Sequence, residues 1–247
     1  MPAPCPHRAG MIRERFFFRE TIATILAEET VHIASAKKGI LAARQALERY
    51  IARDPFFLVT LDPYEPDSDE PVIVRMAQAT AKANVGPMAA VAGAIAWAGV
   101  EEMTERGADF GVIDNGGDIA LISDRNVRVG LHAGTAPLSG RAAFVVPPQA
   151  SILGICTSSA TVGPSISFGV ADAVTVFSHD VALADAYATS ICNQIRIDDA
   201  SVLSKLDPDE IKGVFAVLGE HTKRWGTLPP IIRAVVDEHL ISAGDRL

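Results

Sequence analysis

The chain has 247 residues, of which 49% are hydrophobic and 21% are charged, and its formal net charge is -8. This acidic balance argues against nonspecific binding to nucleic acid or to an anionic membrane, because both need clustered lysine and arginine. The cysteines Cys5, Cys156 and Cys192 form no CxxC pair, so we expect neither a disulfide scaffold nor a structural zinc site. We expect a single domain over residues 1–247, located in the reducing cytoplasm, with a flexible stretch at residues 1–10 and no secretory signal.

The N-terminal half predicts strands followed by helices. Alternating apolar residues, with a turn at Glu28-Glu29, indicate strands within residues 13–34. An apolar face at helical spacing predicts a helix over residues 36–53, and Asp54-Pro55 ends it. Four elements are then expected in order: a short strand or extended segment at 56–61, an acidic loop at 62–71, a helix at 72–82, and a small-residue helix at 89–106 opened by Gly86-Pro87.

The second half predicts mostly strands around one clear helix. Strands at 110–114 and 119–123 are joined by Asn115-Gly116-Gly117-Asp118, and further strands are expected at 127–131, 142–146, 151–156 and 173–177. A helix over 181–194 is expected to be capped by Ser178 or Asp180. Two more helices are expected at 208–218 and 229–241. This order of elements predicts an α+β protein.

Two segments hold residues that a phosphate-bearing ligand could use. The glycines of Asn115-Gly116-Gly117-Asp118 favour positive φ and expose backbone N–H groups, which suits either a phosphate cradle or an ordinary hairpin turn. The segment after residues 151–156 offers hydroxyl groups that suit an anion without lysine or arginine, or that merely cap turns: Thr157, Ser158, Ser159, Thr161 and Ser165. The sequence leaves both alternatives open for each segment.

Asp185 and Thr189 lie four residues apart on the predicted helix at 181–194 and therefore share one face. A carboxylate with a hydroxyl is a partial ligand set for Mg²⁺, although an aspartate near a helix start is also favoured by the helix dipole. Cys156 precedes the hydroxyl-rich segment. It is a candidate nucleophile or persulfide carrier if its thiolate is stabilised, and otherwise a small buried side chain.

Taken in order, these segments resemble the ApbE-like superfamily, whose founding members are FAD:protein FMN transferases. Asn115-Gly116-Gly117-Asp118-Ile119 resembles its Gly-Gly segment, and Thr157-Ser158-Ser159 resembles its Thr-Ser-Gly turn. Ala184-Asp185-Ala186-Tyr187-Ala188-Thr189 resembles its metal-binding Asp-x-x-x-Thr helix. The resemblance spans roughly residues 85–195 and implies an ApbE-like α+β fold, with mixed or antiparallel sheets and packed helices.

The resemblance also implies a site. Asp185 and Thr189 would bind Mg²⁺, and FAD, FMN or a related phosphate-bearing ligand would contact Asn115, Gly116, Gly117, Asp118, Thr157, Ser158, Ser159 and Thr161. Asp185 and Cys156 are the candidate catalytic residues. The transferases carry a His-Ile-Ile-Asp-Pro-like segment where this chain has Pro164-Ser165-Ile166-Ser167-Phe168-Gly169, with neither histidine nor aspartate. That departure leaves FMN transfer open.

Three functions follow from these residues. The first is a flavin- or nucleotide-binding protein or Mg²⁺-dependent transferase. The second is sulfur handling through Cys156, because Gly86-Pro87-Met88-Ala89 and Gly154-Ile155-Cys156-Thr157 resemble signatures of an uncharacterised branch associated with sulfur assimilation toward homocysteine. The third is a non-catalytic ligand-binding subunit. The small residues of 89–100 could also pack against a second copy, which predicts a homodimer.

Overall fold

The computed structural model describes residues 10–161 and 169–236. Its centre is an eight-stranded sheet in the order β1-β2-β3-β4-β7-β8-β9-β10, and a three-stranded sheet has the order β11-β6-β5. Every pair of neighbouring strands is antiparallel. The strands are β1 Ile12–Phe18, β2 Thr21–Ala27, β3 Phe110–Asn115, β4 Asp118–Ser123, β5 Val127–Gly130, β6 Ala142–Val146, β7 Gln149–Ser158, β8 Ala173–Ser178, β9 Gly213–Leu218, β10 His221–Gly226 and β11 Ile231–Arg233. The predicted α+β class is confirmed.

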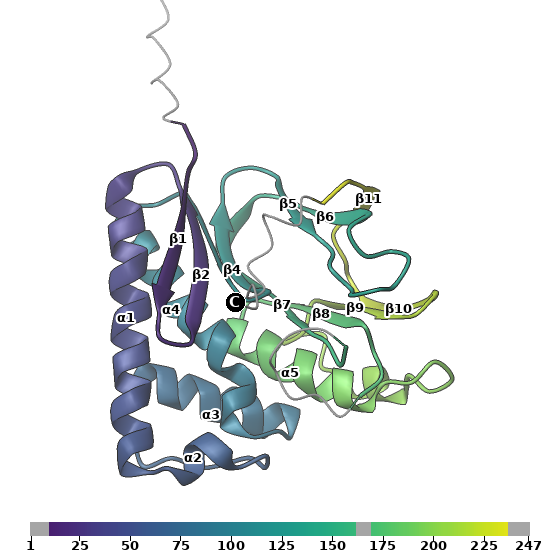
Figure 1. Ribbon diagram of the computed structural model, residues 1–247, viewed down its shortest axis with the longest axis horizontal. Coiled ribbons are helices and arrows are strands. Elements are labelled where there is room, and N and C mark those ends of the chain that lie inside the picture. The colour runs from purple at the N-terminus through teal and green to yellow at the C-terminus, as the bar shows by residue number, and fades with distance from the viewer. Residues whose placement is uncertain (1–9, 162–168, 237–247) are drawn as a thin grey trace, which may run out of the picture.

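The helices gather along one side of the large sheet, and the small sheet covers the other side (Figure 1). They are α1 Thr30–Arg53, α2 Phe56–Val59, α3 Pro71–Ala83, α4 Val91–Glu105 and α5 Val181–Gln194, with 3₁₀ turns η1 Pro87–Ala90 and η2 Ser201–Lys205. Pro71 and Pro87 each stand in the first turn of their element, where a missing N–H costs no hydrogen bond. The helix at 181–194 is confirmed, and its cap is Asp180, which accepts from the Leu183 N–H.

The middle of the large sheet is buried on both faces. Along β3, Ile113 belongs to the core under the helices, whereas Val112 belongs to the core under the small sheet. The same alternation continues on β7, where Cys156 and Ile155 point to opposite layers. The second core is aromatic: Phe144 packs edge-on against Phe177 and Phe215. Residues of these strands are therefore sorted by parity into a helix-facing row and a row facing the small sheet.

Four predicted elements are wrong in whole or in part: the extended segments at 31–34 and 56–61, and the helices at 208–218 and 229–241. Residues 31–34, expected as strand, form the start of α1, because the β-branched residues there belong to the helix that follows Glu29. Residues 56–61, expected as a strand or extended segment, contain the single-turn helix α2. Residues 213–218, placed in a helix over 208–218, are strand β9, whose six residues are all buried. A fully buried strand shows no alternation, so its pattern cannot be told from that of a buried helix.

The helix expected at 229–241 is wrong within the described residues, because 231–233 form strand β11, which pairs with β6. Residues 237–241 of that predicted helix lie outside the described residues. Residues 1–9 of the stretch expected to be flexible also lie outside them. The small residues of α4 contact other helices of the same chain, for Gly39 of α1 lies against Ala98. Their packing is thereby accounted for, and a homodimer stays a prediction.

Within residues 10–161 and 169–236, no single helix has the length and apolar character needed to cross a membrane. By length and composition alone, the segments Pro71–Ala83 and Pro87–Glu105 pass the test together as one pair bent by 104°. Core helices of globular proteins pass the same test, and Ile73 and Met76 of α3 and Ile95 and Val100 of α4 are buried within this chain.

Gly39→Ala is expected to destabilise the protein by about 1–3 kcal/mol, although alanine is the better helix former. A Cβ atom at this position would lie 2.3 Å from the Ala98 carbonyl oxygen, so α1 and α4 would have to separate. Denaturant unfolding measures the change. The exposed Gln45→Ala on the same helix is the control and should leave stability unchanged or slightly raised; a stabilising Gly39→Ala would show that the two helices are not in close contact.

Candidate functional site

The β3–β4 connection is a tight hairpin turn. Gly116 and Gly117 both have positive φ, 72° and 104°, and Asn115 pairs with Asp118 across the turn. Asp114 closes the turn, since its Oδ1 accepts from the Gly117 N–H at 2.9 Å. The hairpin interpretation of this segment is therefore correct, and the turn leaves space above Gly116, where an added Cβ would meet no atom within 4 Å.

Three polar residues lie side by side in one helix-facing row of the sheet. Asn115 of β3 pairs with Asp118 of β4. Strands β4 and β7 are antiparallel and Ile119 pairs with Ile155. The residues next to this pair, Asp118 on β4 and Cys156 on β7, are therefore also neighbours. The Asp118 carboxylate accepts from the Thr157 N–H at 3.2 Å and so also ties β4 to β7. The next residues of the row are apolar: Ala23 of β2 beside Asn115, and Val176 of β8 beside Cys156. The three residues are therefore confined to β3, β4 and β7.

The start of α4 covers this row. Asn115 Nδ2 donates to the Ala92 carbonyl oxygen at 3.0 Å, and the Gly93 N–H donates to Asp185 Oδ2 at 2.8 Å. No side chain at the helix's own start caps it, and the first-turn N–H groups of a helix lack partners within the helix. Asp185 of α5 therefore acts as the cap of α4 from outside. A Cβ on Gly93 would lie 2.9 Å from the Asp185 Cβ, so this contact needs glycine.

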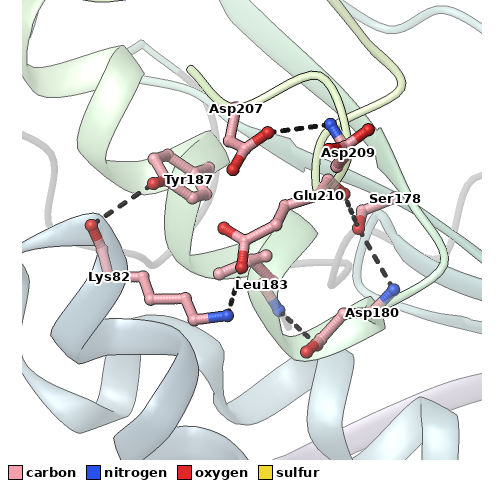
Figure 2. Close-up of polar contacts among 8 residues, drawn as sticks. All are labelled: Lys82, Ser178, Asp180, Leu183, Tyr187, Asp207, Asp209 and Glu210. Carbon is pink, nitrogen blue, oxygen red and sulfur yellow. Dashed lines mark hydrogen bonds and ion pairs between the residues drawn. The ribbon is translucent and has the colours of Figure 1, made fainter. Parts of the chain in front are cut away.

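A polar network fixes α5, and with it Asp185, against its neighbours. Figure 2 shows Ser178 at the end of β8 and Asp180 at the cap of α5, with Ser178 Oγ donating to the Glu210 carbonyl oxygen at 2.6 Å. The Glu210 carboxylate forms an ion pair with Lys82 of α3, and the Tyr187 hydroxyl donates to the Lys82 carbonyl oxygen at 3.3 Å. Helix α5 is thus held between α3 and the segment before β9.

Helix α4 is held by a separate contact. Arg75 of α3 donates two hydrogen bonds to the Glu101 carboxylate, at 2.6 and 2.8 Å, and its guanidinium lies 4.3 Å from the centre of the Trp97 ring. A two-point guanidinium–carboxylate contact fixes orientation as well as distance. The Gly93–Asp185 hydrogen bond therefore joins two helices that are each anchored elsewhere.

Burial dominates the electrostatics of the site. It raises the pKa of Asp185 to about 7, against the lowering effect of the Gly93 and Ala92 backbone N–H groups. Burial also raises the pKa of the Asp118 carboxyl group well above its usual range, and the charge of Asp185 adds to this rise. Burial likewise raises the pKa of the Cys156 thiol, with both carboxylates contributing. Two negative charges are unfavourable in this buried place, so a bound cation would stabilise the ionised forms of both carboxyl groups.

Cys156 has none of the features of an activated cysteine. Its side chain is fully buried, and its Sγ lies 3.6 Å from the Val181 carbonyl oxygen as a hydrogen-bond donor. An activated cysteine needs a partly exposed, electropositive surrounding that favours the thiolate. Here the surroundings favour the thiol, which fits the interpretation of Cys156 as a small buried side chain.

The hydroxyl-rich segment divides between the layers. Thr157 faces away from the helices, and its hydroxyl is 2.9 Å from that of Thr175. Ser158 is buried, whereas Ser159 and Thr161 are near the surface, where Thr161 donates to Asp172 Oδ1 at 3.2 Å. Residues 162–168, which include Ser165 and most of the segment that departs from the transferases, lie outside the described residues.

Thr189 is half-buried one turn beyond Asp185 on α5. Across the part of the chain that the structure describes, no three His, Cys, Asp or Glu side chains group in a way that could hold a metal ion. A cation at Asp185 would therefore depend on hydroxyl, backbone or ligand oxygens as well. Two surface depressions lie elsewhere, one at Arg53 and residues 67–70 and the other among α1, α3 and α4.

The chief feature that the sequence analysis missed is the Ala92–Gly93 peptide. The small residues of the predicted helix at 89–106 allow close approach, and Gly93 is one of them. Sequence alone carried no signal that its N–H meets Asp185, because the two residues are 92 positions apart.

Comparison with known proteins places the fold and the family. A family profile described as "AbpE bacteria" matches residues 18–212. The chain belongs to this family. Its relatives include a UPF0280 protein of Methanoregula boonei, 63% identical over 96% of this chain and 100% of its own length. A UPF0280 protein of Methanoculleus marisnigri is 64% identical over 95% of this chain and 96% of its own length.

Solved structures agree with the family assignment at the level of the fold. The apo flavinyl transferase ApbE of Pseudomonas stutzeri superimposes with a TM-score of 0.62 at 11% identity, covering 90% of this chain and 97% of its own. The flavin transferase ApbE of Vibrio cholerae gives a TM-score of 0.53 at 12% identity, covering 88% and 97%. The predicted resemblance to the ApbE-like superfamily and the predicted ApbE-like fold are confirmed.

Asp185→Asn is expected to change stability in a pH-dependent way. Because folding raises the pKa of Asp185 from 3.8 to about 7, the folded protein binds a proton that the unfolded chain has released between these values. The stability that Asp185 contributes therefore falls as pH rises through this window. Asparagine carries no charge and its side-chain oxygen can still accept from Gly93, so this loss disappears in the variant.

Thermal unfolding in EDTA measures this effect. At about pH 8 Asp185→Asn should be more stable than wild type, and this difference should be smaller at about pH 5, where less of the pH window has been crossed. Asp185→Ala, which also loses the cap, should be less stable than Asp185→Asn by about 1 kcal/mol at both pH values. A wild type that gains stability relative to Asp185→Asn between these pH values would contradict the raised pKa.

Cys156 is expected to react with a thiol-specific reagent only as fast as the protein unfolds. Its burial and raised pKa leave little thiolate at neutral pH. Labelling at about pH 8, in a Cys5→Ser background and with Cys192→Ser as the partner variant, isolates the Cys156 thiol. Labelling at the rate of a free cysteine under native conditions would restore Cys156 as a reactive residue.

Proposed function

We propose that this protein binds FAD, FMN or a related phosphate-bearing ligand together with Mg²⁺ at the Asn115–Asp118–Cys156 row. The observation that carries the proposal is the buried Asp185 carboxylate, held by α4 beside Asp118 in a chain of ApbE-like fold. The proposal is for ligand binding. A Mg²⁺-dependent flavin or nucleotidyl transferase activity is its extension, and transfer of FMN is not required by it.

The residues present suit Mg²⁺ by their chemistry. Asp185, Asp118 and Thr189 supply oxygen donors, and Mg²⁺ in proteins takes one or two carboxylates and completes its shell with waters and ligand phosphates. Both carboxyl groups have raised pKa values because burial opposes their ionisation, and the charge of Asp185 adds to the rise in the pKa of Asp118. A dication would remove that opposition, which is the reason to place it here.

Each residue has a distinct part in binding. When bound, Mg²⁺ would neutralise phosphate charge. The Gly93 N–H holds Asp185, so its carboxylate does not have to be ordered when the ligand arrives. The open space above Gly116 admits a ligand close to the backbone. The hydroxyls of Ser159 and Thr161 lie near the surface, and that of Thr161 would exchange its Asp172 partner for the ligand. The absence of clustered lysine and arginine is compatible with such a ligand, because backbone amides and a cation supply the positive charge.

The sulfur-handling alternative needs a Cys156 thiolate. The thiol is buried and its pKa is raised well above its usual value, so no observation favours that reaction over ligand binding. The non-catalytic alternative shares the same site and differs only in turnover. We therefore keep a single proposal, the binding of a Mg²⁺-dependent phosphate-bearing ligand.

Asp185→Asn is expected to remove the Mg²⁺-dependent part of flavin binding. Replacing a residue that merely holds a metal ligand weakens metal binding by about 10–100-fold, so loss of the carboxylate itself should cost at least about tenfold. Calorimetry with FAD and FMN, each in Mg²⁺ and in EDTA, measures the effect. Asp180→Asn, five residues earlier, keeps a good helix cap and serves as the matched control. Equal Mg²⁺-dependent binding by Asp185→Asn would sink the assignment.

A further inference from the structure

The Ala92–Gly93 peptide is hydrogen-bonded by side chains on both of its sides. Its carbonyl oxygen accepts from Asn115 Nδ2 at 3.0 Å, and its N–H donates to Asp185 Oδ2 at 2.8 Å. The C=O and N–H groups of one peptide share the same resonance, so a hydrogen bond accepted by the oxygen makes the N–H a stronger donor. Asn115 on the sheet and Asp185 on α5 are thus connected through one backbone group of α4.

We propose that Asn115 is a positioning residue that acts on Asp185 through this peptide. It orients and polarises the Ala92–Gly93 peptide, and the peptide in turn holds the Asp185 carboxylate where it meets the cation. The part that concerns the cation rests on the proposed function. The part that concerns the peptide stands on the hydrogen bonds alone.

The turn does not explain Asn115. Asparagine is common next to glycines in hairpins, but here Asp114 accepts the hydrogen bond of the turn N–H. The Asn115 side chain instead reaches α4, and the residue is 7% exposed. The asparagine amide donates to the Ala92 carbonyl oxygen, which an ionised aspartate at the same position would not do.

The start of α4 explains why such a device is needed. The helix has no side-chain cap of its own, so the Gly93 N–H in its first turn takes its partner from Asp185 on α5. The hydrogen bond from Asn115 is a second side-chain contact, on the carbonyl side of the same peptide. The three partners come from β3, α4 and α5, so the arrangement also sets the spacing of the layers at the site.

The amide proton of Gly93 tests the peptide directly. Asn115→Leu removes the donor at nearly equal volume, and the weaker Gly93–Asp185 hydrogen bond should move the Gly93 amide proton resonance upfield at constant pH. Asp185→Asn should move it in the same direction, and the Asp180→Asn control should leave it in place. An unmoved Gly93 resonance in Asn115→Leu overturns the proposal. Asn115→Ala serves the same purpose if the leucine variant does not fold.

Mn²⁺ affinity, measured by electron paramagnetic resonance, tests the consequence for the cation. Asn115→Leu should weaken Mn²⁺ binding by about tenfold. Phe144→Leu in the second core, a destabilising variant remote from the row, should leave Mn²⁺ affinity unchanged. Equal Mn²⁺ affinity in wild type and Asn115→Leu overturns the positioning role. A wild type that binds no Mn²⁺ defeats the proposed function instead, and the Gly93 resonance then still decides whether Asn115 acts on the peptide.

Discussion

The hydrogen bond from the Gly93 N–H to Asp185 is the contact on which the candidate site depends. It joins two helices that the chain separates widely, and it satisfies an N–H group that the start of α4 leaves without a partner. The close approach needs a residue without a Cβ at position 93. The same contact places a carboxyl group in a buried position, where ionisation is opposed. Helix capping and the proposed cation binding therefore converge on one side chain.

The large sheet determines which side chains can join Asp185. Because its central strands are buried on both faces, successive residues belong to opposite cores, and only one parity faces the helices. Asn115, Asp118 and Cys156 have that parity. Thr157 has the opposite parity, and its hydroxyl is hydrogen-bonded to that of Thr175. Residues adjacent in sequence thus serve different layers, and a run of hydroxyl residues does not form one binding surface.

The family and the chemistry are supported to different depths. Close relatives match the chain over nearly its full length, and transferases at 11–12% identity share its fold. Identity this low carries an arrangement of elements and leaves the reaction undecided. What the chain adds is its own site: two carboxyl groups with raised pKa values and a helix start capped from outside. These features motivate a cation and a phosphate-bearing ligand, and they set Cys156 apart as a buried thiol.

Much of this molecule was predictable from sequence, because its signals are local. The hairpin at Asn115–Asp118 follows from two adjacent glycines, and the helix at 181–194 follows from its cap and apolar spacing. The segments quoted for the ApbE-like resemblance also kept their order, so the family could be recognised without coordinates.

Tertiary structure decided whatever depends on burial or on distant pairing. Strand β9 reads like a helix because both of its faces are buried, which erases the alternation that identifies strands. Sequence named Asp185 and Asp118 separately, but only the packing of α5 over β4 buries both and lets the charge of Asp185 raise the pKa of Asp118. The partnership of Asn115, the Ala92–Gly93 peptide and Asp185 was likewise invisible, because a backbone N–H has no sequence signature. Local patterns report what a segment prefers, and a site is made by groups from distant segments that share one buried space.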